Sequence, residues 1–135
     1  MKQNIPVVVI GLGRGRGISD IPPIFQNTPY YVAACMDLTE VDEEYRYSPH
    51  NLSVILHNLH PRPRALLIGI AVDPSYTQPV ERVWNEDVDK VLKLEKKSRG
   101  WTHFVDPQKP ETWSGVRSTW QKEMFRQLDG ALLPK

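Results

Sequence analysis

The most regular signal in the chain is a set of short, uninterrupted apolar runs, each ending beside a glycine or an aspartate. Runs of this kind, rich in β-branched residues, are typical of strands buried on both faces of a parallel sheet. They cover residues 5–12, 30–38, 64–72 and 101–105. We therefore expect a sheet of about four strands, the last of them short.

Helical periodicity fills most of the segments between these runs. A serine followed by a proline, Ser48 and Pro49, is typical of a helix start, and Pro61 ends the pattern that follows. Two longer patterns run over residues 79–97 and from about Glu111 to Leu133. We expect a helix at each of these places.

The segment between the first two runs departs from this regularity. Asp20 is suited to cap a helix there, but Pro22 and Pro23 interrupt it after a turn or two. We therefore expect only a short helix at this point. The acidic stretch of residues 39–47 is expected to form a solvated loop.

The apolar residues of the last helical pattern fall on one face. They are Trp113, Val116, Trp120, Met124, Leu128 and Ala131. Core packing explains such a stripe. A subunit interface is the alternative, because a small sheet has little core to cover so much aromatic bulk. Homodimerisation is therefore one hypothesis.

Strands that alternate with helices predict right-handed βαβ units and an open parallel sheet covered on both faces. Since the chain has 135 residues, we expect a single α/β domain over residues 1–135, Rossmann-like or flavodoxin-like, with three layers. In such sheets, ligands bind beyond the carboxyl ends of the strands, where the strand order reverses.

The first run passes directly into the sequence GLGRGRG, residues 11–17. Glycines let backbone N–H groups approach an anion closely, and the helix that follows adds its positive end. Arginines add bidentate donors for a phosphate or a carboxylate. The candidate binding residues are Gly11, Gly13, Arg14, Gly15 and Arg16. The alternative is a tight turn with solvated arginines.

A dinucleotide is a more specific alternative for this loop. The fingerprint G-x-G-x-x-G would use Gly11, Gly13 and position 16, where the chain has Arg16. Asp37 ends the second run, about where an acidic residue binds a ribose hydroxyl. NAD(P) is therefore one candidate cofactor, and the other expectation is that no cofactor is used.

The segments VVVIGLGRGRG, VAACMDL and ALLIGIAV resemble the N-terminal Rossmann segment of the glucose–fructose oxidoreductase and inositol dehydrogenase family, over about residues 5–72. The resemblance implies a nucleotide-binding loop after the first strand and an acidic residue closing the second. That family carries a catalytic lysine in a Glu-Lys-Pro motif, whereas this chain has Glu95-Lys96-Lys97, so we transfer no catalytic role to it. The family's substrate domain has no counterpart here, so a dehydrogenase of this type would need an oligomer to complete its site.

Charge and composition narrow the range of partners. The formal net charge of +1 argues against general nucleic-acid binding. No apolar run approaches membrane-spanning length and the first lacks the features of a signal peptide, so we expect a cytoplasmic protein with no membrane partner.

The single cysteine, Cys35, excludes an intramolecular disulfide and is expected to pack in the core. His57 and His60 lie three apart without further ligands, so we expect no metal site.

Acid–base candidates lie near the ends of the later runs. Asp73 ends the third run and should share the rim of the sheet with the glycine loop, and Tyr76 follows it. These two residues suit a general base and a proton donor, and a capping turn is the alternative. His103 lies in the fourth run, and Asp106 marks the carboxyl end of that run. His103 is the first choice among the histidines, with a core histidine as the alternative.

These observations support two functions of different kinds. The first is a small enzyme that acts on an anionic small molecule by cofactor-free acid–base chemistry, such as an isomerisation, cyclisation, lyase or hydrolytic step. The second is an NAD(P)-dependent oxidoreductase completed by oligomerisation. A non-catalytic nucleotide-sensing or interaction domain is a third reading, because fold does not fix function.

Overall fold

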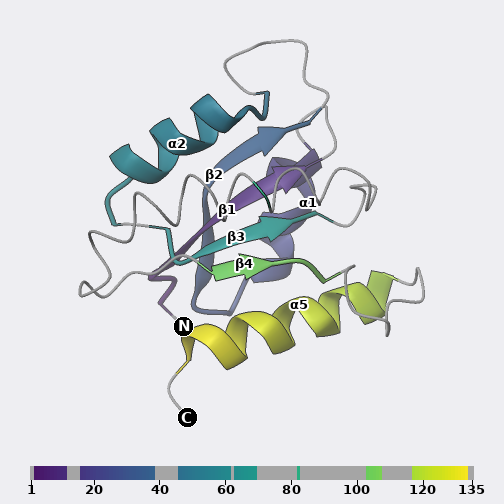
Figure 1. The fold of residues 1–135 in the computed structure, drawn as a ribbon. Helices are drawn as coiled ribbons and strands as arrows, with labels where there is room; N and C mark the ends of the chain where they lie inside the picture. Colours follow the sequence, from purple (N-terminus) through teal and green to yellow (C-terminus); the bar gives the residue numbers. More distant parts are fainter. Residues whose placement is uncertain are drawn as a thin grey trace.

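The computed structural model has helices on both faces of an open parallel sheet (Figure 1). The residues that it describes are 2–11, 16–38, 46–61, 63–69, 82, 103–107 and 117–133. Apart from residue 82, the helix expected over residues 79–97 lies outside this part of the chain, and so do residues 39–45 of the expected loop.

The apolar runs form the strands, as expected. They are β1 (Ile5–Gly11), β2 (Tyr30–Asp37), β3 (Ala65–Ile68) and β4 (His103–Val105). The pairings are parallel, in the order β2-β1-β3-β4. The expected α/β class is therefore confirmed. β3 has 4 residues and β4 has 3, while residues 70–72 and 101–102 of the corresponding runs lie outside the described residues.

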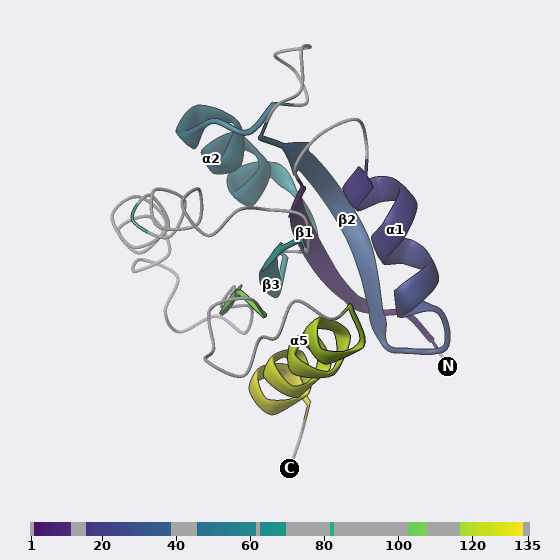
Figure 2. The ribbon, with the colours of Figure 1, turned by 90° about the vertical axis from the view of Figure 1, so that its right-hand side faces the viewer.

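The strand order reverses at β1. From β1 the chain crosses to β2 on one side, and from β2 it returns past β1 to β3 on the other. Crossovers of one hand that run in opposite directions put their helices on opposite faces. Accordingly, α1 (Arg16–Phe25) packs on one face and α2 (Pro49–Asn58) on the other, as Figure 2 shows.

Helix α1 is longer than the sequence predicts. It has 10 residues and continues through Pro22 and Pro23. Each proline removes a helical N–H donor, but Ile21 and Phe25, four residues apart, are both buried against the sheet. This packing outweighs the local preference of the prolines. Asp20 therefore lies inside the helix and does not cap it, so both expectations for this segment were wrong.

Helix α2 begins as the sequence predicts. Ser48 is its N-cap, with the side-chain oxygen accepting a hydrogen bond of 3.0 Å from the backbone N–H of Asn51. Pro49 occupies the first turn, where its missing N–H has no helical partner to lose. The helix ends at Asn58, and Leu52 is its fully buried anchor against the sheet.

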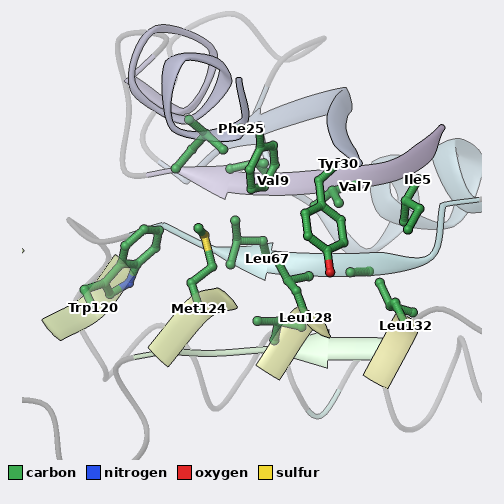
Figure 3. Close-up of a cluster of buried hydrophobic side chains, with 13 residues drawn as sticks. Ile5, Val7, Val9, Phe25, Tyr30, Leu67, Trp120, Met124, Leu128 and Leu132 are labelled. Carbon is green, nitrogen blue, oxygen red and sulfur yellow. The ribbon is translucent and has the colours of Figure 1, made fainter. Parts of the chain in front are cut away.

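The larger core lies between the sheet and α5 (Arg117–Leu132), on the face that also carries α1 (Figure 3). The buried residues of α5 repeat every fourth position. They are Trp120, Met124, Leu128 and Leu132. Trp120, Met124 and Leu128 of the expected stripe are confirmed as buried, but Ala131 is exposed and Leu132 takes its place. Trp113 and Val116 lie outside the described residues. Trp120 is 0% exposed within this single chain, so its bulk serves core packing.

The end of the sheet where the strands begin, here called the amino edge, is held by part-buried hydrogen bonds. The hydroxyl of Tyr30 donates to Asp129 Oδ1 of α5 over 2.5 Å. Gln3 Nε2 donates to the carbonyl oxygens of Phe25 and Tyr30, at 2.8 and 2.9 Å. Both ends of the chain lie on this side of the molecule (Figure 1).

Candidate functional site

The carboxyl ends of the strands meet along one side of the sheet, here called the carboxyl edge. Gly11 is the register partner of Asp37 on β2. On its other side, Ile10 pairs with Ile68 of β3, so Gly69 follows beside Gly11. Asp106 directly follows β4. The register thus brings together two glycines flanked by two aspartates.

The two glycines lie in close backbone contact. The N–H of Gly69 donates to the carbonyl oxygen of Ile10 over 2.9 Å. A Cβ atom on Gly69 would stand 3.2 Å from that oxygen and 3.7 Å from Gly11 Cα. Since β1 and β3 are the strands at which the order reverses, this bare backbone lies at the position where open α/β sheets bind ligands. The sequence analysis missed Gly69, although an isolated glycine in an apolar run is a signal of close backbone approach.

Both aspartates of the carboxyl edge are buried. Asp37 is 4% exposed and Asp106 5% exposed, and they are the buried charged residues among those whose burial the structure describes. The carbonyl oxygen of Asp37 accepts from the N–H of Tyr47 over 2.7 Å. The backbone of Asp106 exchanges two hydrogen bonds of 3.2 Å with the side chain of Gln127 on α5. Burying a carboxylate costs free energy unless it is hydrogen-bonded or paired. The burial of both aspartates at this edge therefore requires specific surroundings.

A small polar pocket adjoins this edge beyond β2. It is lined by Arg46, Ser48, His50 and Asn51, at the start of α2. The backbone of Arg46 forms an isolated parallel β-bridge with the backbone of Asp37. The carbonyl oxygen of Arg46 accepts a hydrogen bond of 2.9 Å from Asn51 Nδ2. The sequence analysis missed this pocket because it treated residues 39–47 as a solvated loop, whereas Arg46 and Tyr47 are half-buried.

The glycine–arginine loop joins β1 to α1. Gly11 ends β1 and Arg16 begins α1, so both sides of the turn are fixed. Gly13, Arg14 and Gly15 lie outside the described residues, as does the side chain of Arg16. The anion-binding role of this loop therefore stays a prediction.

Of the three acid–base candidates, the structure describes the backbone of His103. Asp73 and Tyr76 lie outside the described part of the chain. His103 begins β4 and pairs with Ala65, which in turn pairs with Val7. Gly11 is four residues further along β1, a rise of about 13 Å along the strand. The register thus brings Asp106, rather than the backbone of His103, to the level of the glycines.

The metal and cysteine expectations concern His57, His60 and Cys35. His60 is exposed, and the side chain of His57 lies outside the description. Within the described ranges, no three metal-ligating side chains form a group. Cys35 is half-buried and packs against the larger core, with Sγ 4.0 Å from Asp37 Oδ1. No helix in the described part of the chain is both long and apolar enough to cross a bilayer.

No protein-family model matches the chain, and comparisons with curated proteins and with solved structures find no match.

Proposed function

We propose that this chain is a small enzyme that binds the anionic group of its substrate at the carboxyl edge and acts on it by cofactor-free acid–base chemistry. The observation that carries the proposal is the contact of Gly11 with Gly69 at the point where the strand order reverses. Neither strand end carries a side chain at this point, so only backbone groups form the edge between β1 and β3. In open α/β sheets this position is the usual ligand site.

The anionic character of the ligand follows from the turn beside this point. Residues 12–15 connect Gly11 directly to α1, a helix of 10 residues that begins at Arg16. A glycine-rich turn and a helix N-terminus together favour a phosphate or a carboxylate. Arg14 and Arg16 supply charge-assisted donors for the same group.

The acid–base groups are proposed from the ends of β3 and β4. Asp73 and Tyr76 follow Gly69 closely in the chain, as base and donor. Asp106 joins them because it directly follows β4 and is 5% exposed, so the register places a buried carboxyl group at the same edge of the sheet. His103 ranks behind Asp106, because its backbone lies at the far end of β4.

The finer fold assignment is also a proposal. Among the described strands, the order 2-1-3-4 is the beginning of the flavodoxin-like order 2-1-3-4-5 and differs from the Rossmann order 3-2-1-4-5-6. Flavodoxin-like sheets bind their phosphate-bearing ligands between the first and third strands. This is where Gly11 and Gly69 meet.

An NAD(P)-dependent oxidoreductase is the second candidate, and one observation favours it. Asp37 is the direct register partner of Gly11, as an acidic residue that binds a ribose hydroxyl would be. Helix α1 continues through Pro22 and Pro23, so a helix of 10 residues follows the glycine loop, as a dinucleotide site requires. Arg16 in the fingerprint stands against this candidate, and a homodimer would have to complete the site.

The test measures binding of pyrophosphate, AMP, NAD(H) and NADP(H) by calorimetry to the wild type and to the double variant R14A/R16A. Loss of two charge-assisted hydrogen bonds predicts at least a tenfold lower affinity for the anionic ligand. The matched control is K122A/R126A, which removes the same charge from exposed positions of α5. Unchanged affinity in R14A/R16A would overturn the proposal.

The variant D37A separates the two candidates. If NAD(P) is the ligand, D37A loses affinity for NAD(H) but keeps its affinity for pyrophosphate. If a compact anion is the ligand, pyrophosphate or AMP binds to the wild type and dinucleotides bind no better.

A further inference from the structure

One buried polar atom near the carboxyl edge has no partner. Trp120 is 0% exposed, and its indole Nε1–H has no hydrogen-bond acceptor among the described residues. Buried donors nearly always have a partner, and an exception calls for an explanation such as a bound water, ion or ligand. The hydroxyl of Tyr30 in the same core shows the usual arrangement, because it donates to Asp129.

The position of Trp120 relates this atom to the proposed site. Figure 3 shows Trp120 at the arrowhead end of the core cluster, past Val9 and Leu67, whereas Leu132 lies at the opposite end with Ile5. The first turn of α5 is therefore at the same end of the sheet as the two glycines.

Strand alternation indicates which residues end the two strands on this side. Val9 and Leu67 face α5, so the next positions on the same face are Gly11 and Gly69. Neither glycine has a side chain to cover this end of the core. Trp120 is the cluster residue of α5 that lies at this end of the sheet (Figure 3).

We propose that Trp120 is a binding residue and that its Nε1–H donates to an acceptor oxygen of the ligand, from the α5 side of the sheet. This inference rests on the proposed function, and it specifies the chemistry of the ligand further. An indole N–H only donates, so the ligand presents a phosphate, carboxylate or carbonyl oxygen between the strand ends and α5. A ligand that offers only donors there is excluded.

The test uses W120F, which keeps a buried aromatic ring but removes the N–H. Pyrophosphate and AMP are the probes, and we expect the affinity of the better one to fall about tenfold to 150-fold, as for one lost hydrogen bond to a charged group. The control is M124L, one turn further on the same buried face. It has no donor in either form and is expected to leave the affinity unchanged.

A spectroscopic readout separates binding from packing. The indole N–H resonance of Trp120, identified by its absence from the spectrum of W120F, is expected to shift downfield when the probe binds. If W120F does not fold, single phenylalanine substitutions of Trp84, Trp101 and Trp113 identify the resonance by elimination, and its response in the wild type decides.

The outcomes distinguish this inference from the proposed function. If the wild type binds a probe but the Trp120 resonance does not move and W120F binds as tightly, the inference is wrong and the proposed function stands. If the wild type binds neither probe, the proposed function fails, and the inference fails with it.

Discussion

At the scale of single residues, the two glycines at positions 69 and 130 show opposite reasons for lacking a side chain. Gly69 is buried, and a Cβ there would stand 3.2 Å from the carbonyl oxygen of Ile10. Gly130 is exposed on α5, and a Cβ there would meet nothing within 4 Å. Only Gly69 is required by its surroundings.

We expect G69A to lower the free energy of unfolding by about 1 kcal/mol, because one backbone contact must move by a few tenths of an ångström. G130A should raise it by about 0.5–1 kcal/mol, because alanine favours the helix. Urea unfolding of both variants measures the difference. A stabilised G69A would show that the ends of β1 and β3 do not approach as described.

At the scale of elements, helix α2 follows from local sequence and α1 does not. The Ser48–Pro49 pair sets the start of α2 through its own side chain and ring. Helix α1 instead contains two prolines and depends on the burial of Ile21 and Phe25. Local sequence rules therefore predict α2 well. They underestimate the length of α1, because the stability of α1 comes from tertiary packing.

The variant S48A tests the local origin of α2. Loss of the hydrogen bond to the N–H of Asn51 is expected to cost about 0.5–2 kcal/mol of unfolding free energy. S48D should recover most of this loss, because aspartate caps equally well. V54A, at an exposed position of the same helix, is the control for a change that leaves the cap intact. Equal unfolding midpoints for S48A and the wild type would contradict the capping role.

The positions of the strands could be predicted from sequence, but their register and order could not. Continuous apolar runs predicted all of the described strands, because burial on both faces leaves a strong pattern. The register and the order of the strands left no such pattern, since they depend on pairing between distant segments. For this reason Gly69 was missed, and Asp106 was taken only as the end of the fourth run although the register brings it to the carboxyl edge.

At the scale of the whole molecule, contacts at the amino edge join the first half of the chain to its last helix. Tyr30 and Asp129 are 99 positions apart in sequence and share a hydrogen bond of 2.5 Å. Burial is the main cause that raises the pKa of Tyr30 far above its ordinary value of 10.0, and the hydrogen bond to Asp129 adds to it. The folded state therefore favours the neutral phenol.

This shift predicts how stability depends on pH. Because the pKa is higher in the folded state, the stabilisation is complete below the unfolded value of 10.0 and is lost as pH rises above it. Y30F lacks the hydrogen bond, so it should be less stable by about 1 kcal/mol near neutral pH. The difference between Y30F and the wild type in urea unfolding should stay constant below about pH 9 and shrink as pH rises above about 10. A constant difference would contradict a buried, neutral phenol.

The placement of both chain ends beside the amino edge has a practical consequence for attachment. A tether at either terminus holds the molecule by the side opposite Gly11 and Gly69, so an immobilised sample presents the carboxyl edge to the solution. Biosensor measurements with N-terminal and C-terminal capture should therefore give the same ligand affinity. A fluorophore placed at either end would lie near the Tyr30–Asp129 hydrogen bond that joins α5 to the sheet, and it would not block access to the carboxyl edge.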